Sequence, residues 1–200
     1  MINLNNKKEK LEFLIDLAWE IYLERLCKRK IKLNLEASMQ LHFSSIINSL
    51  GEILTVTPRE KFSIDLEHKV NDKYLDIQTS FNHVKAAIEL KCFRKQSNRA
   101  KDIDMYDALN DIARLDSMSG FSVRRFICLT DDVAYLRDKK RGHAKVVSLH
   151  DGRKIHKNDK IVPTWTDWKN KSRNKELQFS QDIELKWSQK DIWHFLIVNL

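Results

Sequence analysis

The chain has 200 residues, a length that fits one domain with a sizeable buried core. Lysine and arginine number 36 against 28 acidic residues, and the net charge of +8 favours a polyanionic partner without establishing one. The three cysteines have no disulfide or zinc spacing, and no apolar run reaches membrane-spanning length or follows the signal-peptide pattern, so we expect a cytoplasmic protein with no membrane partner.

Two helices are predicted first. Residues 7–28 carry apolar side chains at helical spacing, and the charged stretch CKRKIKLN ends that pattern. A second helix is expected over 35–50, with Asn34 as its N-cap and Gly51 as its terminator. Glu36 lies one turn before the apolar stripe of this helix. It either points toward the sheet or complements the helix dipole as a first-turn acid, and both interpretations stay open.

Three strands follow. Residues 60–70 alternate as a strand, and residues 74–93, YLDIQTSFNHVKAAIELKCF, form a hairpin around Asn82 and His83. This turn pairs Phe81 with Val84 and therefore places Asp76 opposite Glu89. Because side chains alternate along a strand, the polar face holds Tyr74, Asp76, Gln78, Ala87, Glu89 and Lys91.

Opposed carboxylates on this polar face repel each other unless a cation offsets their charge. A divalent metal ion supplies one such charge, and Lys91 supplies another on the same face. Each half of the hairpin by itself resembles a solvated strand face. The segment AAIELKCF is otherwise apolar, however, and an interior strand rarely keeps charges without partners.

The next segments complete an element order. A basic loop with Arg94, Lys95, Arg99 and Lys101 is a candidate for phosphate contacts, and a solvated loop is the alternative. A helix is expected from an N-cap at Asp102 to about 118, with Gly120 after it and its acids forming a solvated face. Residues 121–130 are a buried strand. From residue 35 the order is therefore α-β-β-β-α-β.

The last third of the chain is basic. Residues 137–160 contain nine lysines and arginines, including Lys139, Lys140 and Arg141, which makes this segment a candidate DNA-binding surface. Trp165 and Trp168 either stack on bases or anchor their loop on the protein. The apolar tail 191–200 is either a late strand of the sheet or part of a dimer interface.

The spacing of Asp76, Glu89 and Lys91 gives the pattern D-x12-E-x-K, which resembles the signature of the PD-(D/E)xK nuclease superfamily. Leu75 stands where the family name has proline. The superfamily includes type II restriction endonucleases and nucleases of repair and of mobile elements. The resemblance implies a restriction-endonuclease-like core over about 35–131, an α/β fold whose central mixed sheet is flanked by helices. We expect this core within a single domain, 1–200, with the helix 7–28 before it and a basic extension, 132–200, after it.

The resemblance also implies a chemistry. Mg²⁺, with Mn²⁺ as a substitute, would assist hydrolysis of DNA phosphodiester bonds. Lys91 would orient or deprotonate the attacking water, and Gln78, on the same face, would contact water or phosphate. The expected metal ligands are Asp76, Glu89, the carbonyl of Leu90 and Glu36.

Several functions remain open. A type II restriction endonuclease is expected, as a homodimer or with a partner subunit, because one site must act twice to cut both strands. The alternatives are a repair or mobile-element nuclease, a non-cleaving DNA-binding module, and a basic RNA-binding or assembly protein. The recognition sequence and the number of metal ions are not determined by these patterns.

Overall fold

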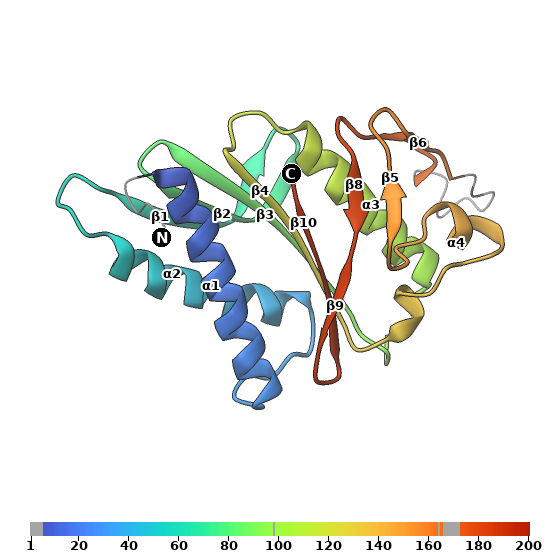
Figure 1. The fold of residues 1–200 in the computed structure, drawn as a ribbon, viewed down its shortest axis with the longest axis horizontal. Coiled ribbons are helices and arrows are strands. Elements are labelled where there is room, and N and C mark those ends of the chain that lie inside the picture. Colours follow the sequence, from blue (N-terminus) through green and yellow to red (C-terminus); the bar gives the residue numbers. More distant parts are fainter. Residues whose placement is uncertain (1–5, 98, 164, 166–172) are drawn as a thin grey trace. The chain divides into compact units, whose positions relative to one another are not determined.

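The computed structural model describes residues 6–97, 99–163, 165 and 173–200 (Figure 1). The fold is mixed α/β, as predicted, with a six-stranded mixed sheet in the order β1-β2-β3-β4-β10-β9 and flanking helices. The order α2-β1-β2-β3-α3-β4 confirms the predicted succession α-β-β-β-α-β. Two small sheets pair β5 with β8 and β6 with β7.

The elements have the following bounds. The first five are α1 (Lys7–Cys27), α2 (Glu36–Leu54), β1 (Phe62–Val70), β2 (Lys73–Phe81) and β3 (Val84–Phe93). They are followed by α3 (Lys101–Ser117), β4 (Val123–Thr130), the 3₁₀ turn η1 (Val133–Tyr135) and α4 (Gly142–Val146). The short strands are β5 (Arg153–Ile155), β6 (Lys160–Ile161), β7 (Leu177–Gln178), β8 (Ile183–Leu185), β9 (Trp187–Lys190) and β10 (Trp193–Asn199).

The chain forms two compact units. The first comprises the residues up to Cys92 together with Ser119–Arg125 and Asn199–Leu200. The second comprises Phe93–Met118 and Phe126–Val198. The single domain expected for 1–200 stays a prediction.

Helices α1 and α2 pack on each other through aromatic side chains (Figure 1). Trp19 stacks on Tyr22 with ring centroids 5.4 Å apart and meets the edge of Phe43 at 5.7 Å. All three side chains are buried, and such aromatic pairs contribute beyond the area that they bury. The predicted first helix is confirmed, and its apolar stripe is the face that packs on α2.

A buried ion pair also holds α1. The Nζ of Lys10, a fully buried residue, lies 2.7 Å from Oε2 of Glu60, just before β1, and 4.5 Å from the centre of the Phe81 ring. Burial by itself would raise the pKa of Glu60. The hydrogen bond and charge of Lys10 outweigh that effect, so the pKa of Glu60 is lower than usual.

Both predicted boundaries of the second helix were wrong. The N-cap is Leu35, not Asn34, and the hydroxyl of Ser38 accepts hydrogen bonds from the N–H groups of both residues, at 3.2 and 3.0 Å. Gly51 does not end the helix, which continues to Leu54. A Cβ at Gly51 would come within 2.2 Å of the Phe62 ring, so this glycine permits close packing instead.

The predicted hairpin is confirmed. Phe81 pairs with Val84 and Ile77 with Ile88, around a turn in which Asn82 has a φ of 54°. Asparagine tolerates this left-handed conformation better than most residues. The register of β2 and β3 is therefore fixed by a two-residue turn, as the sequence indicates.

Helix α3 begins two residues earlier than predicted. Its N-cap is Ala100, so Asp102 lies inside the first turn and is not the cap. The side chain of Asp102 instead accepts a hydrogen bond from the indole N–H of Trp165 at 3.4 Å. The helix ends at Ser117, and Gly120 follows it at a φ of 83°.

The acids of α3 are not a solvated face. Asp104 and Asp116 are buried, and each accepts hydrogen bonds from residues distant in the sequence. The hydroxyl of Tyr135 donates to Asp104 at 2.7 Å, and the hydroxyl of Ser180 donates to Asp116 at 2.8 Å. Burial raises the pKa of Asp104. Sequence spacing marks the apolar stripe but not the polar residues that long-range partners bury.

The apolar tail forms β10, between β4 and β9 in the sheet order, which confirms the predicted late strand. Within the part of the chain that the structure describes, no helix has the length and apolarity needed to cross a lipid bilayer.

Candidate active site

The candidate site lies in the first unit, at Asp76, next to the last pair of the β2–β3 ladder. The ladder runs from Phe81–Val84 to Ile77–Ile88, and the pairing of Asp76 with Glu89 stays a prediction. Here Oδ2 of Asp76 accepts a hydrogen bond from the main-chain N–H of Leu90 at 2.6 Å. The Asp76 carboxylate therefore lies directly against the main chain of β3, next to Glu89.

The main chain around Asp76 is held by a side chain of α2. Nε2 of Gln40 donates to the carbonyl of Asp76 at 2.8 Å and to Oε1 of Glu67 at 2.9 Å. Glu67 lies in β1 at a φ of 51°, a left-handed conformation that costs about 1–2 kcal/mol for a residue other than glycine. Such conformations cluster at functional sites. Irregular backbone thus coincides with the position of the candidate metal ligand.

Glu36, the first residue of α2, points toward β3. Its Oε2 accepts from the main-chain N–H of Cys92 at 3.3 Å, and its Oε1 lies 3.5 Å from Nζ of Lys91. Of the two interpretations of Glu36, the structure thus gives the orientation toward the sheet. Sequence reasoning missed Gln40, although its position four residues after Glu36 puts both side chains on one face of the helix.

Two carboxylates lie along one side of β3. The N–H groups of Leu90 and Cys92 point to the same side because they are two residues apart, and Asp76 and Glu36 accept one each. Two residues of a strand span about 6.5 Å. Lys91 lies between Leu90 and Cys92 in the strand, so a cationic residue separates the two positions that bind carboxylates.

Glu89 and Lys91 differ in how far they are buried. Glu89 is 2% exposed, whereas the side chain of Lys91 is 15% exposed. Nζ of Lys91 donates to the carbonyl of Leu90 at 3.1 Å, in addition to its contact with Glu36. A charge so enclosed needs polar partners, and these contacts hold the ammonium beside the carboxylates.

Gln78 lies two residues beyond Asp76 and is 6% exposed. Its Nε2 donates to Oδ2 of Asp65 at 3.5 Å, and its buried Oε1 finds no hydrogen-bond partner among the residues described. An unsatisfied buried oxygen on the same strand face as Asp76 is a place for a water molecule or a cation.

The oxygens at this site fit a hard divalent cation in kind. Carboxylate and main-chain carbonyl oxygens are the ligands that Mg²⁺ and Mn²⁺ prefer. Asp76, Glu89 and the carbonyl of Leu90 supply them, and Oε1 of Gln78 adds an acceptor nearby. In the described ranges, no three His, Cys, Asp or Glu side chains gather closely enough to hold a metal ion jointly.

Most cations of the predicted basic loop form ion pairs within the second unit. Arg94 lies 3.0 Å from Asp131, Arg99 lies 2.9 Å from Asp104, and Lys101 lies 2.6 Å from Asp132. Lys95 is exposed, although its main-chain N–H donates to Asp131. Three of these four side chains therefore fasten the loop, and their binding to DNA stays a prediction.

Lys139 and Lys140 also have internal contacts. Lys139 donates to the carbonyl of Ala134 at 2.5 Å, and Lys140 pairs with Asp138. Arg141 is exposed. DNA binding by this segment likewise stays a prediction.

The two tryptophans have separate outcomes. Trp165 is 5% exposed and packs between Tyr106 and His143, with ring centroids 5.2 and 5.1 Å away. It therefore anchors its loop on the second unit. Trp168 lies outside the described residues.

Comparison with known proteins gives no relative: no family model, no curated protein and no solved structure matches this chain. Support for a function therefore comes from the geometry of the site.

Proposed function

We propose that this protein is a metal-dependent endonuclease that hydrolyses phosphodiester bonds in DNA and has a restriction-endonuclease-like core of the PD-(D/E)xK kind. One observation carries the proposal. The carboxylates of Asp76 and Glu36 accept the N–H groups of Leu90 and Cys92, the two neighbours of Lys91 in β3, beside the buried Glu89. The element order of the core supports the same assignment.

Asp76, Glu89 and the carbonyl of Leu90 would hold Mg²⁺, with Glu36 as a further acid beside Lys91. When bound, the cation would lower the pKa of a water molecule and stabilise negative charge on the phosphate and the leaving oxygen. Two hydrogen bonds orient Asp76 for metal binding: its carboxylate accepts the N–H of Leu90, and its main-chain carbonyl accepts from Gln40.

Lys91 has the central role among the chain's own groups. Its ammonium, held by Glu36 and the carbonyl of Leu90, is placed to orient the attacking water and to offset charge on the pentacoordinate phosphorus. The Oε1 of Gln78 would accept a hydrogen bond from a water molecule in the site.

Nicking of supercoiled plasmid by the purified full chain tests the proposal. We expect cleavage with Mg²⁺ or Mn²⁺, no cleavage with a chelator, and loss of cleavage in Lys91→Met. Lys85→Met is the matched control, because Lys85 is an exposed lysine of the same strand. An inactive wild-type protein with both metals, or an active Lys91→Met protein, would contradict the proposal.

The particular role that we propose is restriction in the cytoplasm by a homodimer or with a partner subunit. A repair or mobile-element nuclease has the same chemistry. The difference lies in where the enzyme cuts, which the ends of the products report.

A further inference from the structure

A strongly basic segment follows α1 in the first unit. Residues 25–35 contain five lysines and arginines and no acid: Arg25, Lys28, Arg29, Lys30 and Lys32. All five are exposed. We call residues 28–32 the basic turn.

The basic turn has a defined backbone. The N–H of Lys30 donates to the carbonyl of Arg25 at 2.8 Å, and the N–H of Arg29 donates to the carbonyl of Leu26 at 3.0 Å. These two bonds define a Schellman helix ending, whose left-handed position is most often glycine. Here Arg29 occupies it at a φ of 54°. An arginine thus stands where the backbone favours glycine.

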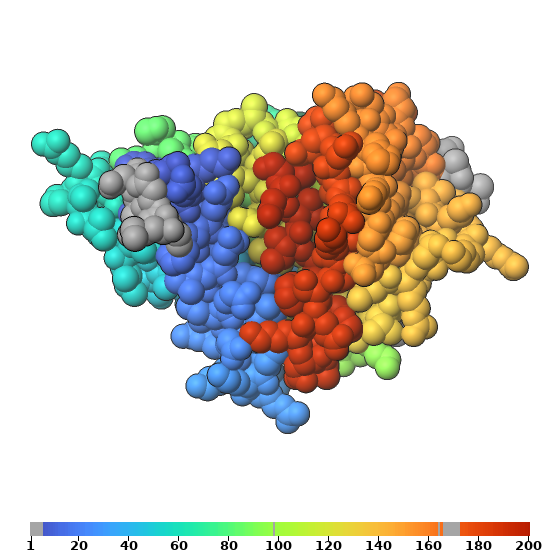
Figure 2. Space-filling model, in the orientation of Figure 1, coloured from blue at the N-terminus to red at the C-terminus, as the bar shows by residue number. Residues whose placement is uncertain are grey.

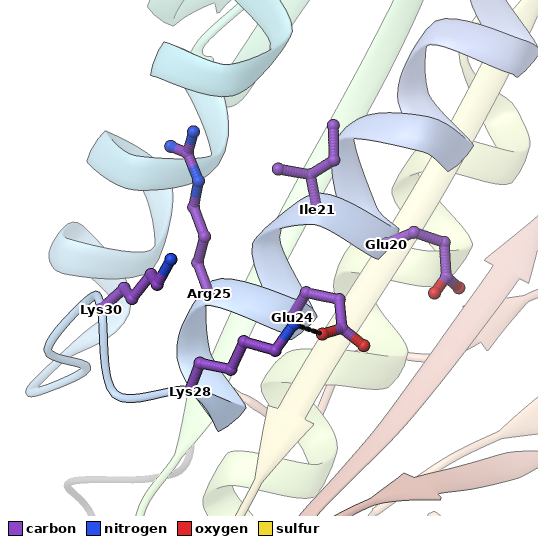
Figure 3. Close-up of a pocket in the computed structure, with 6 residues that line it drawn as sticks. All are labelled: Glu20, Ile21, Glu24, Arg25, Lys28 and Lys30. Atoms are coloured by element: carbon purple, nitrogen blue, oxygen red, sulfur yellow. Dashed lines mark ion pairs between the residues drawn. The ribbon is translucent and has the colours of Figure 1, made fainter.

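Figure 3 shows Lys28 and Lys30 of the turn together with Arg25 in the last turn of α1. Lys28 folds back on Glu24, with Nζ 2.9 Å from Oε2. Arg25 and Lys30 line a surface hollow of about 260 Å³ together with these two residues, Glu20 and Ile21. In Figure 3, Arg25 and Lys30 point to one side of the helix end, away from the Lys28–Glu24 pair. The hollow thus presents two cations on a side separate from that ion pair.

The chain connects the basic turn closely to the candidate site. Lys32 precedes Glu36 by four positions, so their Cα atoms are at most about 14 Å apart, and those of Arg29 and Glu36 at most about 25 Å. Phosphates of one DNA strand recur about every 3.4 Å along the helix axis. A strand that passes Glu36 would therefore span the distance to the turn within about four to seven nucleotides.

Charge at the end of a helix has an ordinary explanation, because cations complement the negative end of the helix dipole. That effect falls off within the last turn and does not account for Lys32 or for the exposure of Arg29 in a left-handed conformation. The segment following α1 also forms part of the surface in Figure 2. By contrast, Arg94 and Lys101 are already paired with acids.

We infer that the basic turn binds the sugar-phosphate backbone of duplex DNA next to the cleavage site. This inference rests on the proposed function for the choice of DNA. The turn carries cations and no base-reading element of its own, so its contacts are electrostatic, independent of sequence and sensitive to salt. An anionic membrane surface is a different partner with the same charge preference, and the test separates the two.

Binding of the full chain to a short fluorescent DNA duplex without metal tests the inference over a series of salt concentrations. The variant Arg29→Gln, Lys30→Gln, Lys32→Gln should bind more weakly, with the slope of log affinity against log salt reduced by up to about 2.7, at about 0.9 for each phosphate that is no longer neutralised. The matched comparison is Lys61→Gln, Lys73→Gln, Lys85→Gln, which removes the same charge from exposed positions elsewhere in the first unit. An equal or larger loss in that variant would overturn the inference.

Arg29→Gly separates binding from helix termination. Glycine relieves the left-handed position, so the melting temperature should stay equal or rise while DNA affinity falls. A lower melting temperature with unchanged affinity would assign Arg29 to the helix end alone and overturn the inference. Stronger binding to phosphatidylserine vesicles than to DNA, abolished in the triple turn variant, would also overturn it.

The two proposals fail separately. A wild-type protein that binds duplex DNA through the turn but does not cut it with Mg²⁺ or Mn²⁺ would refute the nuclease and leave the turn as a DNA-binding element. A protein that cuts DNA and whose DNA affinity is unchanged by the turn substitutions would refute the DNA-binding turn and leave the nuclease proposal intact.

Discussion

Asp76 has two roles that substitution can separate. Its carboxylate is a candidate metal ligand, and Oδ2 also accepts the N–H of Leu90 at 2.6 Å. Asp76→Asn keeps an oxygen in this position and removes the charge. Asp76→Ala removes the acceptor altogether. Both variants should lose cleavage, whereas only the alanine variant should lose much stability.

The magnitudes follow from the hydrogen bond. A bond to a charged acceptor contributes about 1.5–3 kcal/mol and a neutral one about 0.5–1.5 kcal/mol, so Asp76→Asn should lower the free energy of unfolding by about 1 kcal/mol. Leu90 is fully buried, and leaving its N–H unsatisfied costs about 1–3 kcal/mol, so Asp76→Ala should lose about 2–3 kcal/mol. Loss of a metal ligand removes several kcal/mol of transition-state stabilisation, which is at least about 10²-fold in rate for either variant.

Urea unfolding and plasmid nicking on the same preparations measure the two roles. Asp72→Asn, at an exposed acid in the β1–β2 turn, is the matched control and should leave both unchanged. Cleavage by Asp76→Asn at the wild-type rate would remove Asp76 from the mechanism. Equal stability of the asparagine and alanine variants would refute the energetic role of the hydrogen bond to Leu90.

Four further predictions concern the first unit and the products. Glu36→Gln should lower the cleavage rate or raise the Mg²⁺ concentration needed, because it weakens the ion pair with Lys91. Glu52→Gln, at an exposed site of the same helix, should change neither. Identical metal titrations for the two variants would mean that Glu36 only complements the helix dipole. Lys10→Met should lower the free energy of unfolding by about 3 kcal/mol, because it breaks the closest ion pair of Glu60 and leaves only Lys7 at 3.9 Å, and a loss under about 1 kcal/mol by urea titration would contradict this. Because the pKa of Glu60 is lowered in the folded state, Glu60 contributes to the free energy of unfolding above the ordinary glutamate pKa, and this contribution is lost as the pH falls through the lowered value. Glu60→Gln should flatten the dependence of stability on pH in that range. An unchanged dependence would refute the assignment. Sequencing of the ends cut from a random plasmid library should give one short palindrome for a two-fold dimeric restriction enzyme, and scattered ends would favour a repair nuclease.

The sequence by itself determined the hairpin and the composition of its polar face. A two-residue turn at Asn82 and His83 fixes the register of the pairs from Phe81–Val84 to Ile77–Ile88. The period of two predicts Asp76, Glu89 and Lys91 on one face. These relations are local, because they need only residues close together in the chain. The element order was predictable for the same reason, since apolar periodicity acts within each helix or strand.

Only the tertiary structure decided which side chains complete the site. Gln40 and Glu36 reach Asp76 and β3 across 36 and 56 residues of sequence, a contact that depends on how α2 packs on the sheet. Gly51 was predicted to end a helix, yet its use is to admit the ring of Phe62. The arginines and lysines after β3 looked alike in sequence, but acids more than 30 residues away pair with Arg94 and Lys101. Composition gives a side chain its charge, and its availability to a ligand depends on partners that only folding brings near.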